Sequence, residues 1–232
     1  MFRLRRRDEP AGPEPKDDVA VNAPETPGLD AEARHDERLL QAAQRGDLPS
    51  FNALVARHER AVYAVCLRML GDSDAAEDAT QETFIKAWTS INSFRGGLVR
   101  PWLLRIATNR CYDILRARAR RPADSLDAVP FETEPSWSSQ TPGEHPEAFA
   151  ARSELSARLE RALQLLPDDQ RLAVILADVH GHPYEEIAEI TGVAVGTVKS
   201  RISRARARLR DLLREDPASR ELFDRFLRLP ED

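Results

Sequence analysis

The feature that most constrains the fold is the spacing of apolar residues, which recur every three or four positions through long stretches of the 232-residue chain. Between residues 51 and 69 this spacing is unbroken, and Gly71 follows directly. The stripe consists of Phe51, Leu54, Val55, His58, Val62, Val65, Cys66 and Met69. Such a period predicts an amphipathic helix with one buried face, closed by a glycine. Because the pattern recurs in other segments and no strand-like alternation competes with it, we expect an all-α fold.

Composition divides the chain into five parts. Residues 1–35 are rich in Pro, Asp, Glu and Ala without a hydrophobic period, which predicts a disordered extension. Residues 36–121 form one helical domain, and residues 151–214 form a second. Between them, residues 122–150 contain five prolines and six acidic residues but no Lys or Arg, the composition of a flexible acidic linker. Residues 215–232 are a tail that could add an amphipathic turn.

Local signals place the helix ends. A short first helix is expected to end near Gly46, and Asp74 with Glu77 resembles a capping box at the start of a third helix. The loop SFRGGLVR then leads to Pro101, which we place at the first position of a fourth helix. In the second domain we expect helices at 151–166, 168–180, 184–191 and 196–213, since Pro167, the Gly181-His182-Pro183 break and Gly192 separate them.

Charge is segregated along the chain. The formal net charge is -5, yet residues 95–121 hold eight arginines against one acid, Asp113. Residues 195–214 hold Lys199 and six arginines against one acid, Asp211. Two separated basic surfaces are typical of a DNA-binding protein, whereas solvated helix faces usually mix the two signs.

The segment YEEIAEITGVAVGTVKSRI combines a short helix, a glycine-containing turn and a longer helix, the layout of a helix-turn-helix. On a helical wheel, one arc of the second helix collects its apolar residues, which are Val198, Ile202, Ala205, Leu209, Leu212 and Leu213. Small polar residues lie opposite, with basic residues beside them, as a helix in the major groove requires. The side chains expected to face DNA are Thr197, Lys199, Ser200, Arg201, Ser203, Arg204, Arg206 and Arg208.

These motifs resemble a known family. The stretches DATQETFIKAW and SFRGGLVRPWLLRIATNRCYDILRARARR resemble the second conserved region of extracytoplasmic-function sigma factors, the small bacterial initiation subunits of RNA polymerase. The stretches LERALQLLPDDQRLAVIL and HPYEEIAEITGVAVGTVKSRISRARARLR resemble the fourth region. The resemblance covers residues 36–121 and 151–214. It implies a cytoplasmic factor without cofactor or enzymatic activity, whose partners are core RNA polymerase, through its clamp helices and flap, promoter DNA and an anti-sigma factor.

The resemblance also assigns roles to residues. An acidic helix face formed by Asp78, Gln81 and Glu82 would dock on the polymerase clamp helices. The loop SFRGGLVR and the following helix would take the minus-ten element, with the loop capturing an unstacked base. The positions matching that role are Arg95, Arg100, Trp102, Arg105, Asn109, Arg110 and Asp113. The helix-turn-helix would read the minus-thirty-five element, and the acidic linker would run through the polymerase channel.

The sequence leaves other functions open. A helix-turn-helix regulator without a polymerase role would lack a use for the first domain and its acidic face. A metalloenzyme could use Asp178, His180 and His182, although two alternate histidines without a third ligand of helical spacing are usually a polar turn. A helical scaffold would leave the segregated arginines unexplained. Cys66 and Cys111 lie on apolar stripes, where buried free thiols are expected, and no apolar run is long enough to span a membrane or to form a secretory signal.

Overall fold

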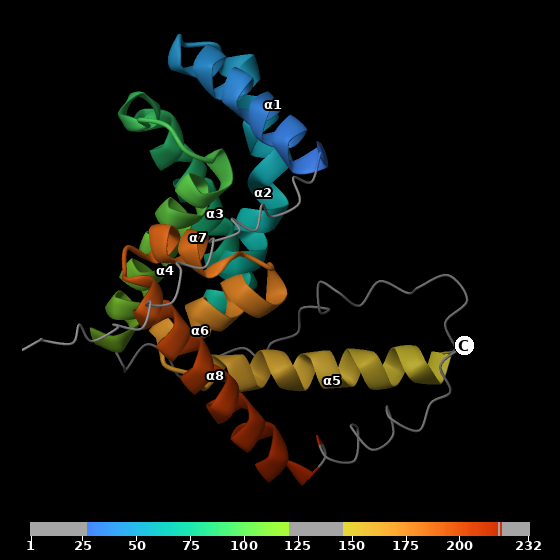
Figure 1. The fold of residues 1–232 in the computed structure, drawn as a ribbon. Helices are drawn as coiled ribbons and strands as arrows, with labels where there is room; N and C mark the ends of the chain where they lie inside the picture. Colours follow the sequence, from blue (N-terminus) through green and yellow to red (C-terminus); the bar gives the residue numbers. More distant parts are fainter. Residues whose placement is uncertain (1–26, 121–145, 218, 220–232) are drawn as a thin grey trace, which may run out of the picture.

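The computed structural model describes residues 27–120, 146–217 and 219, and within them all regular structure is helical, as predicted. Figure 1 shows the arrangement. The first domain contains α1 (Pro27–Gln44), α2 (Leu48–Leu70), α3 (Ser73–Thr89), the short 3-10 helix η1 (Ile91–Ser93) and α4 (Val99–Arg120). The second contains α5 (Pro146–Gln164), α6 (Asp168–Val174), the π-helical turn η3 (Ile175–Val179), α7 (Tyr184–Thr191) and α8 (Val195–Glu215).

Helix α2 is the centre of the first domain and packs against α1, α3 and α4. The Asp47 side chain accepts a hydrogen bond from the Ser50 backbone N–H at 3.2 Å, and Gly71 ends the helix in the left-handed region with φ 67°. The predicted apolar stripe is buried, with Val65, Cys66 and Met69 fully covered. Cys66 and Cys111 are both buried free thiols, which confirms the expectation for them.

The predicted His58 position is also confirmed, because its ring is buried between α1 and α2. Its Nε2 atom lies 2.7 Å from Asp36 Oδ2, and Arg57 Nε lies 2.6 Å from Asp36 Oδ1. Burial lowers the pKa of His58, although the neighbouring Asp36 opposes the shift. The Asp36 carboxylate on α1 therefore binds two side chains of α2 and helps to hold the two helices together.

Several predicted boundaries were wrong. Helix α1 begins at Pro27 rather than near Asp36, because Ala, Glu and Arg are strong helix formers and a proline is tolerated in a first turn. For the same reason α5 begins at Pro146, inside the predicted linker.

Helix α4 begins at Val99, so Pro101 is in its first turn but not at its first position. The cap of α3 is Asp72, whose carboxylate accepts from Ala75 N–H at 2.7 Å, and not Asp74. Residues 1–26, 121–145 and 220–232 lie outside the described part of the chain, so the predicted extension, linker and tail are described only at their edges.

The helix-turn-helix is formed by α7 and α8, as predicted. Gly192 turns the chain between them with φ 70°, and its N–H donates to Ala188 O at 2.8 Å. The predicted arc of α8 is confirmed, since Val198, Ile202 and Ala205 are buried. Leu209 is buried with them, while Leu212 and Leu213 are partly buried.

The two domains pack together, which the sequence did not predict. One hydrophobic core joins α2, α3 and α4 to residues of the second domain that include Leu176, Ile187, Ile190 and Ile202. A smaller core lies between α5, α6 and α8. Helix α7 packs directly on α4, and Figure 1 shows it lying across that helix. The helix-turn-helix is therefore mounted on the first domain rather than held apart from it.

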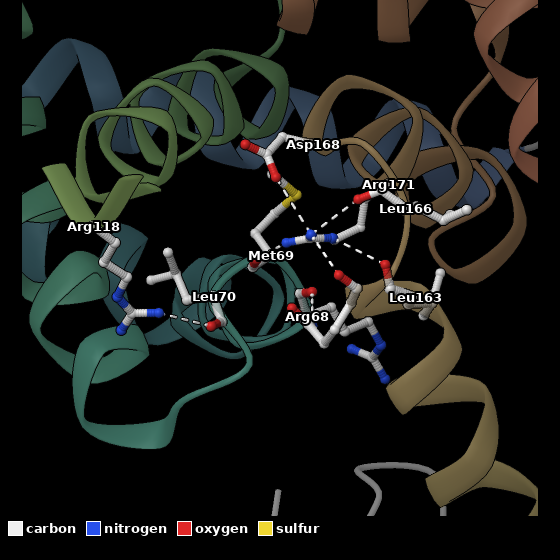
Figure 2. Close-up of polar contacts among 9 residues, drawn as sticks. Arg68, Met69, Leu70, Arg118, Leu163, Leu166, Asp168 and Arg171 are labelled. Carbon is white, nitrogen blue, oxygen red and sulfur yellow. Dashed lines mark hydrogen bonds and ion pairs between the residues drawn. The ribbon is translucent and has the colours of Figure 1, made fainter. Parts of the chain in front are cut away.

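Polar contacts at the carboxyl end of α2 complete this interface (Figure 2). Arg171 of α6 is buried and donates from Nη1 to Met69 O at 2.6 Å. It also donates to Leu163 O and Leu166 O, each at 3.0 Å, within its own domain. Gln164 donates from Nε2 to Arg68 O at 2.7 Å. Because carbonyls at a helix end lack partners within the helix, these donors satisfy groups that burial would otherwise make costly.

Candidate nucleic-acid interface

The outer face of α8 carries the residues predicted to face duplex DNA. Thr197, Lys199, Ser203 and Arg208 are exposed, and Ser200 is half-buried. These residues are exposed because the apolar side chains on the opposite side of α8 pack against α5 and α6. These side chains are thus accessible to a ligand.

Arg204 is held along this face by a residue one turn earlier. Its Nε donates to Ser200 O at 3.2 Å and its Nη2 donates to Ser200 Oγ at 3.0 Å. The Ser200 hydroxyl in turn donates to Thr197 O at 2.9 Å. The exposed guanidinium is therefore pre-oriented along the helix surface, which lowers the entropy lost when it binds a base edge or a phosphate.

Two other arginines of α8 are tied to acids of their own domain. Arg201 Nε lies 2.9 Å from Asp169 Oδ2 at the start of α6. Arg206 binds Asp178 of η3 through two nitrogens, at 2.9 Å and 2.5 Å, and these hydrogen bonds raise its pKa. These two arginines were predicted to be DNA-facing. The structure places them beside the face, where they orient α8 on its domain.

The second basic surface lies on α4 and the loop before it. Arg95, Arg100, Arg105 and Asn109 are exposed, whereas Trp102 is half-buried. The Trp102 ring meets the Phe94 ring edge-on, with centroids 5.2 Å apart and planes at 64°. Gly96 and Gly97 in the loop have φ values of 114° and 103°, which a side chain would disfavour.

Loop and helix enclose a hollow of about 200 Å³. Its walls are residues 93–98, Pro101, Trp102 and Arg105, together with Glu189 from α7. Aromatic edges and cationic side chains around a small hollow suit an unstacked nucleobase with its phosphate. The exposed Leu98 side chain stands at the rim of this hollow.

Other predicted residues of α4 are engaged within the first domain. Arg110 donates from Nη2 to Glu82 Oε1 at 2.7 Å, so a predicted DNA contact and a predicted polymerase contact are joined in one ion pair. Asp113 accepts from Arg116 Nη2 at 2.6 Å. Both pairs are substantially exposed, and such pairs add little to stability.

The acidic face of α3 is exposed at Asp78, Gln81 and Glu82. Sequence reasoning missed Ile85, which lies one turn further along the same stripe and is 63% exposed. Its position seven residues after Asp78 was the available signal, because i, i+3, i+4 and i+7 share a helix face. An exposed isoleucine beside carboxylates is the composition of a protein-binding patch.

Tyr112 and Glu189 were also missed. Burial raises the pKa of Tyr112 to about 12, and the charged groups that act on it include Arg201, Asp169 and Asp168 of the second domain. Glu189 reaches the hollow from α7. No sequence signal could have predicted the surroundings of these two side chains, because both depend on contact between the domains.

The groups that suggested a metal have other partners. His182 Nδ1 lies 2.7 Å from Glu186 Oε2, and Asp178 is bound to Arg206. Across residues 27–120, 146–217 and 219, no three His, Cys, Asp or Glu side chains gather in a way that could hold a metal ion. The described helices also include none that is long and apolar enough to cross a membrane.

Two family models match the chain, one in each helical domain. The model of Sigma-70 region 2 matches residues 54–121, and the model of Sigma-70, region 4, matches residues 156–209. The ECF RNA polymerase sigma factor SigE of Mycolicibacterium smegmatis is 41% identical over 170 residues, which cover 72% of this chain and 62% of that protein. The RNA polymerase sigma-H factor of Pseudomonas aeruginosa is 39% identical over 189 residues, covering 78% of this chain and 96% of that protein. The ECF RNA polymerase sigma-E factor of Escherichia coli is 39% identical over 173 residues, covering 74% and 90%.

Solved structures give the same result. The sigma factor RpoE from Bartonella quintana, crystallised with the anti-sigma factor NepR, matches with a TM-score of 0.56 and 35% identity over 73% of this chain and 99% of that one. CnrH, in complex with the cytosolic domain of CnrY, matches with a TM-score of 0.57 and 29% identity over 78% and 99%.

Proposed function

We propose, since this chain belongs to the extracytoplasmic-function (ECF) family of RNA polymerase sigma factors, that it binds core RNA polymerase in the cytoplasm and directs it to promoters. The observation that carries the proposal is the pair of basic helical surfaces, on α4 with its loop and on α8. Each lies within one of the two matched regions. A relative of the same fold, RpoE of Bartonella quintana, is bound to an anti-sigma factor, and we propose a partner of that class for this chain as well.

Each surface receives one promoter element in this proposal. The exposed face of α8, with Lys199, Ser203 and Arg204, reads the minus-thirty-five duplex in its major groove. The hollow beside α4 takes an unstacked base of the minus-ten element, with Trp102 as a stacking surface and Arg105 as a phosphate contact. Reading an unstacked base suits the step at which the duplex opens.

The deciding experiment is transcription reconstituted from core polymerase and genomic DNA, with and without this protein, followed by sequencing of the RNA 5′ ends. We expect start sites that appear only with the protein and share two upstream motifs. If the starts are the same in number and position without it, the proposal is wrong.

The polymerase contact is proposed for the face of Asp78, Gln81, Glu82 and Ile85. Asp78→Lys should weaken core-polymerase binding about tenfold, because the substitution reverses a charge within an interface. Glu59→Lys is the matched control, since Glu59 is equally exposed but lies on α2. Binding is measured by fluorescence anisotropy of labelled protein titrated with core enzyme. Equal affinity of the two variants would reject this docking face.

A further inference from the structure

Helix α7 lies on the surface proposed to take the minus-ten element. It packs on α4, and its Glu189 side chain lines the hollow together with Arg95, Trp102 and Arg105. Glu189 is exposed and is not needed for the core of its own domain, whose buried positions on α7 are Ile187 and Ile190. A carboxylate therefore stands at a cationic hollow that is shaped for nucleic acid.

The end of α7 adds negative potential at the same place. Arg105 Nη2 lies 3.9 Å from the position that a Cβ atom on Gly192 would occupy, so its guanidinium reaches the carboxyl end of α7. That end of a helix carries partial negative charge, which attracts a cation. A phosphate bound by Arg105 would take the place of this helix end.

This arrangement is incompatible with binding both promoter elements. The elements are centred about 25 base pairs apart by name, which is roughly 85 Å of duplex at 3.4 Å per pair. In the structure α7 contacts α4 and α8 at the same time, so both basic surfaces belong to one packed body. The segment joining Arg120 to Pro146 could span up to about 94 Å when fully extended, which is enough to let the two domains separate by this distance. Promoter binding thus requires α7 to leave α4.

The interface between the two domains contains a buried ion pair whose separation costs little free energy. Arg68 of α2 and Glu160 of α5 form a buried ion pair, with Nε and Oε1 3.2 Å apart. Burial raises the pKa of Glu160 and lowers that of Arg68, which shows that desolvation outweighs their attraction. Within the described residues, Glu160 Oε2 accepts no hydrogen bond. Because the loss of hydration outweighs their attraction, the two charges add no net stability to the interface, so separating and rehydrating them costs little free energy.

We propose that α7 is an internal occupant of the minus-ten site, and that Glu189 stands where a phosphate of the captured strand would bind until DNA displaces it. The face of α8 remains exposed in this closed state, so the chain can meet duplex DNA before it accepts a single strand. This inference rests on the proposed function of α4.

The test measures DNA binding by the full-length chain and two single variants. The probes are a fluorescent single strand carrying the upstream motif nearest the mapped start sites, and a duplex carrying the farther motif. Glu189→Gln should bind the single strand about fivefold more tightly than wild type, because DNA no longer competes with an internal anion. Glu185→Gln is the matched control, since it removes the same charge from an exposed position of α7 outside the hollow. It should bind like wild type, and all three proteins should bind the duplex equally.

Equal single-strand affinities of Glu189→Gln and Glu185→Gln would overturn the inference while leaving the proposed function intact. If no variant binds the single strand, either alone or assembled with core polymerase, the minus-ten role of α4 is itself wrong and the inference falls with it. Small-angle scattering gives a readout independent of charge: the radius of gyration of the wild type should increase when the single strand is bound. An unchanged radius in the bound state would also overturn the inference.

Discussion

The two basic helices, α4 and α8, are both rich in arginine but have different surroundings. On α8 the residues Lys199, Ser203 and Arg204 are exposed, and the acids that bind Arg201 and Arg206 come from the same domain. On α4 the hollow beside Arg105 is shared with α7 of the other domain. The exposed face of α8 is formed by residues of the second domain alone, whereas access to the basic face of α4 depends on how the two domains pack.

The difference shows that local basicity does not by itself define a binding surface. A run of arginines predicts electrostatic attraction to DNA, but tertiary contacts decide which guanidinium groups meet solvent and which meet carboxylates. Here one surface is available in the packed state, and the other is partly occupied by the chain itself. The following predictions test this contrast, beginning with the largest expected effect.

The stability of the contact between the second domain and α2 should depend on Arg171. Arg171→Leu should lower the free energy of unfolding by about 3 kcal/mol or more, because it leaves the carbonyls of Met69, Leu163 and Leu166 without their donor in a buried site. Arg118→Ala should cost less than about 1 kcal/mol, since its hydrogen bond to Leu70 O comes from an exposed side chain. Urea unfolding followed by circular dichroism measures both. Similar losses would mean that burial of Arg171 does not matter.

On α8, substitutions should distinguish Arg204, which is hydrogen-bonded to Ser200, from Arg206, which is bound to a carboxylate. Arg204→Ala should weaken binding of duplex DNA with the farther upstream motif by about 1 to 3 kcal/mol and relax its sequence preference. Arg206→Ala should cost less than about 1 kcal/mol, because that guanidinium is already bound to Asp178. Affinities are compared at one fixed salt concentration. A larger loss for Arg206→Ala would reverse the assignment of these two side chains.

The interface should also weaken in acid through His180. Burial, with Arg68, Arg100 and His182 nearby, lowers the pKa of His180 to about 4 from 6.5. Because the folded state binds the proton less well than the unfolded state, this contribution is complete above pH 6.5 and is lost as the pH falls toward about 4.

Wild type should therefore lose more thermal stability between about pH 7.5 and about pH 5 than His180→Gln, which cannot titrate there. His58 titrates in both proteins, so its effect cancels in the difference between them. Parallel loss of Tm in the two proteins would show that the pKa of His180 is not lowered in the folded state.

Much of the fold follows from local sequence. The spacing of Phe51 to Met69 determines α2, and the arc of Val198, Ile202 and Ala205 determines which side of α8 faces inward. Helix ends were less well predicted, as α1 and α5 show, because alanine-rich segments with prolines read as extended chain while their residues favour helix. The exposed face of α8 was predicted correctly because its burial depends on the period of one helix.

The sequence by itself determined two helical domains, two basic surfaces and membership of one family, since each depends on residues close together in the chain. Only the tertiary structure decided that the domains share a core, that Arg171 binds the end of α2 and that Glu189 reaches the hollow beside α4. These contacts join residues roughly a hundred positions apart, and their free energy depends on desolvation and distance. A local sequence pattern determines neither quantity, so only the folded chain shows that α7 lies on the basic surface of α4.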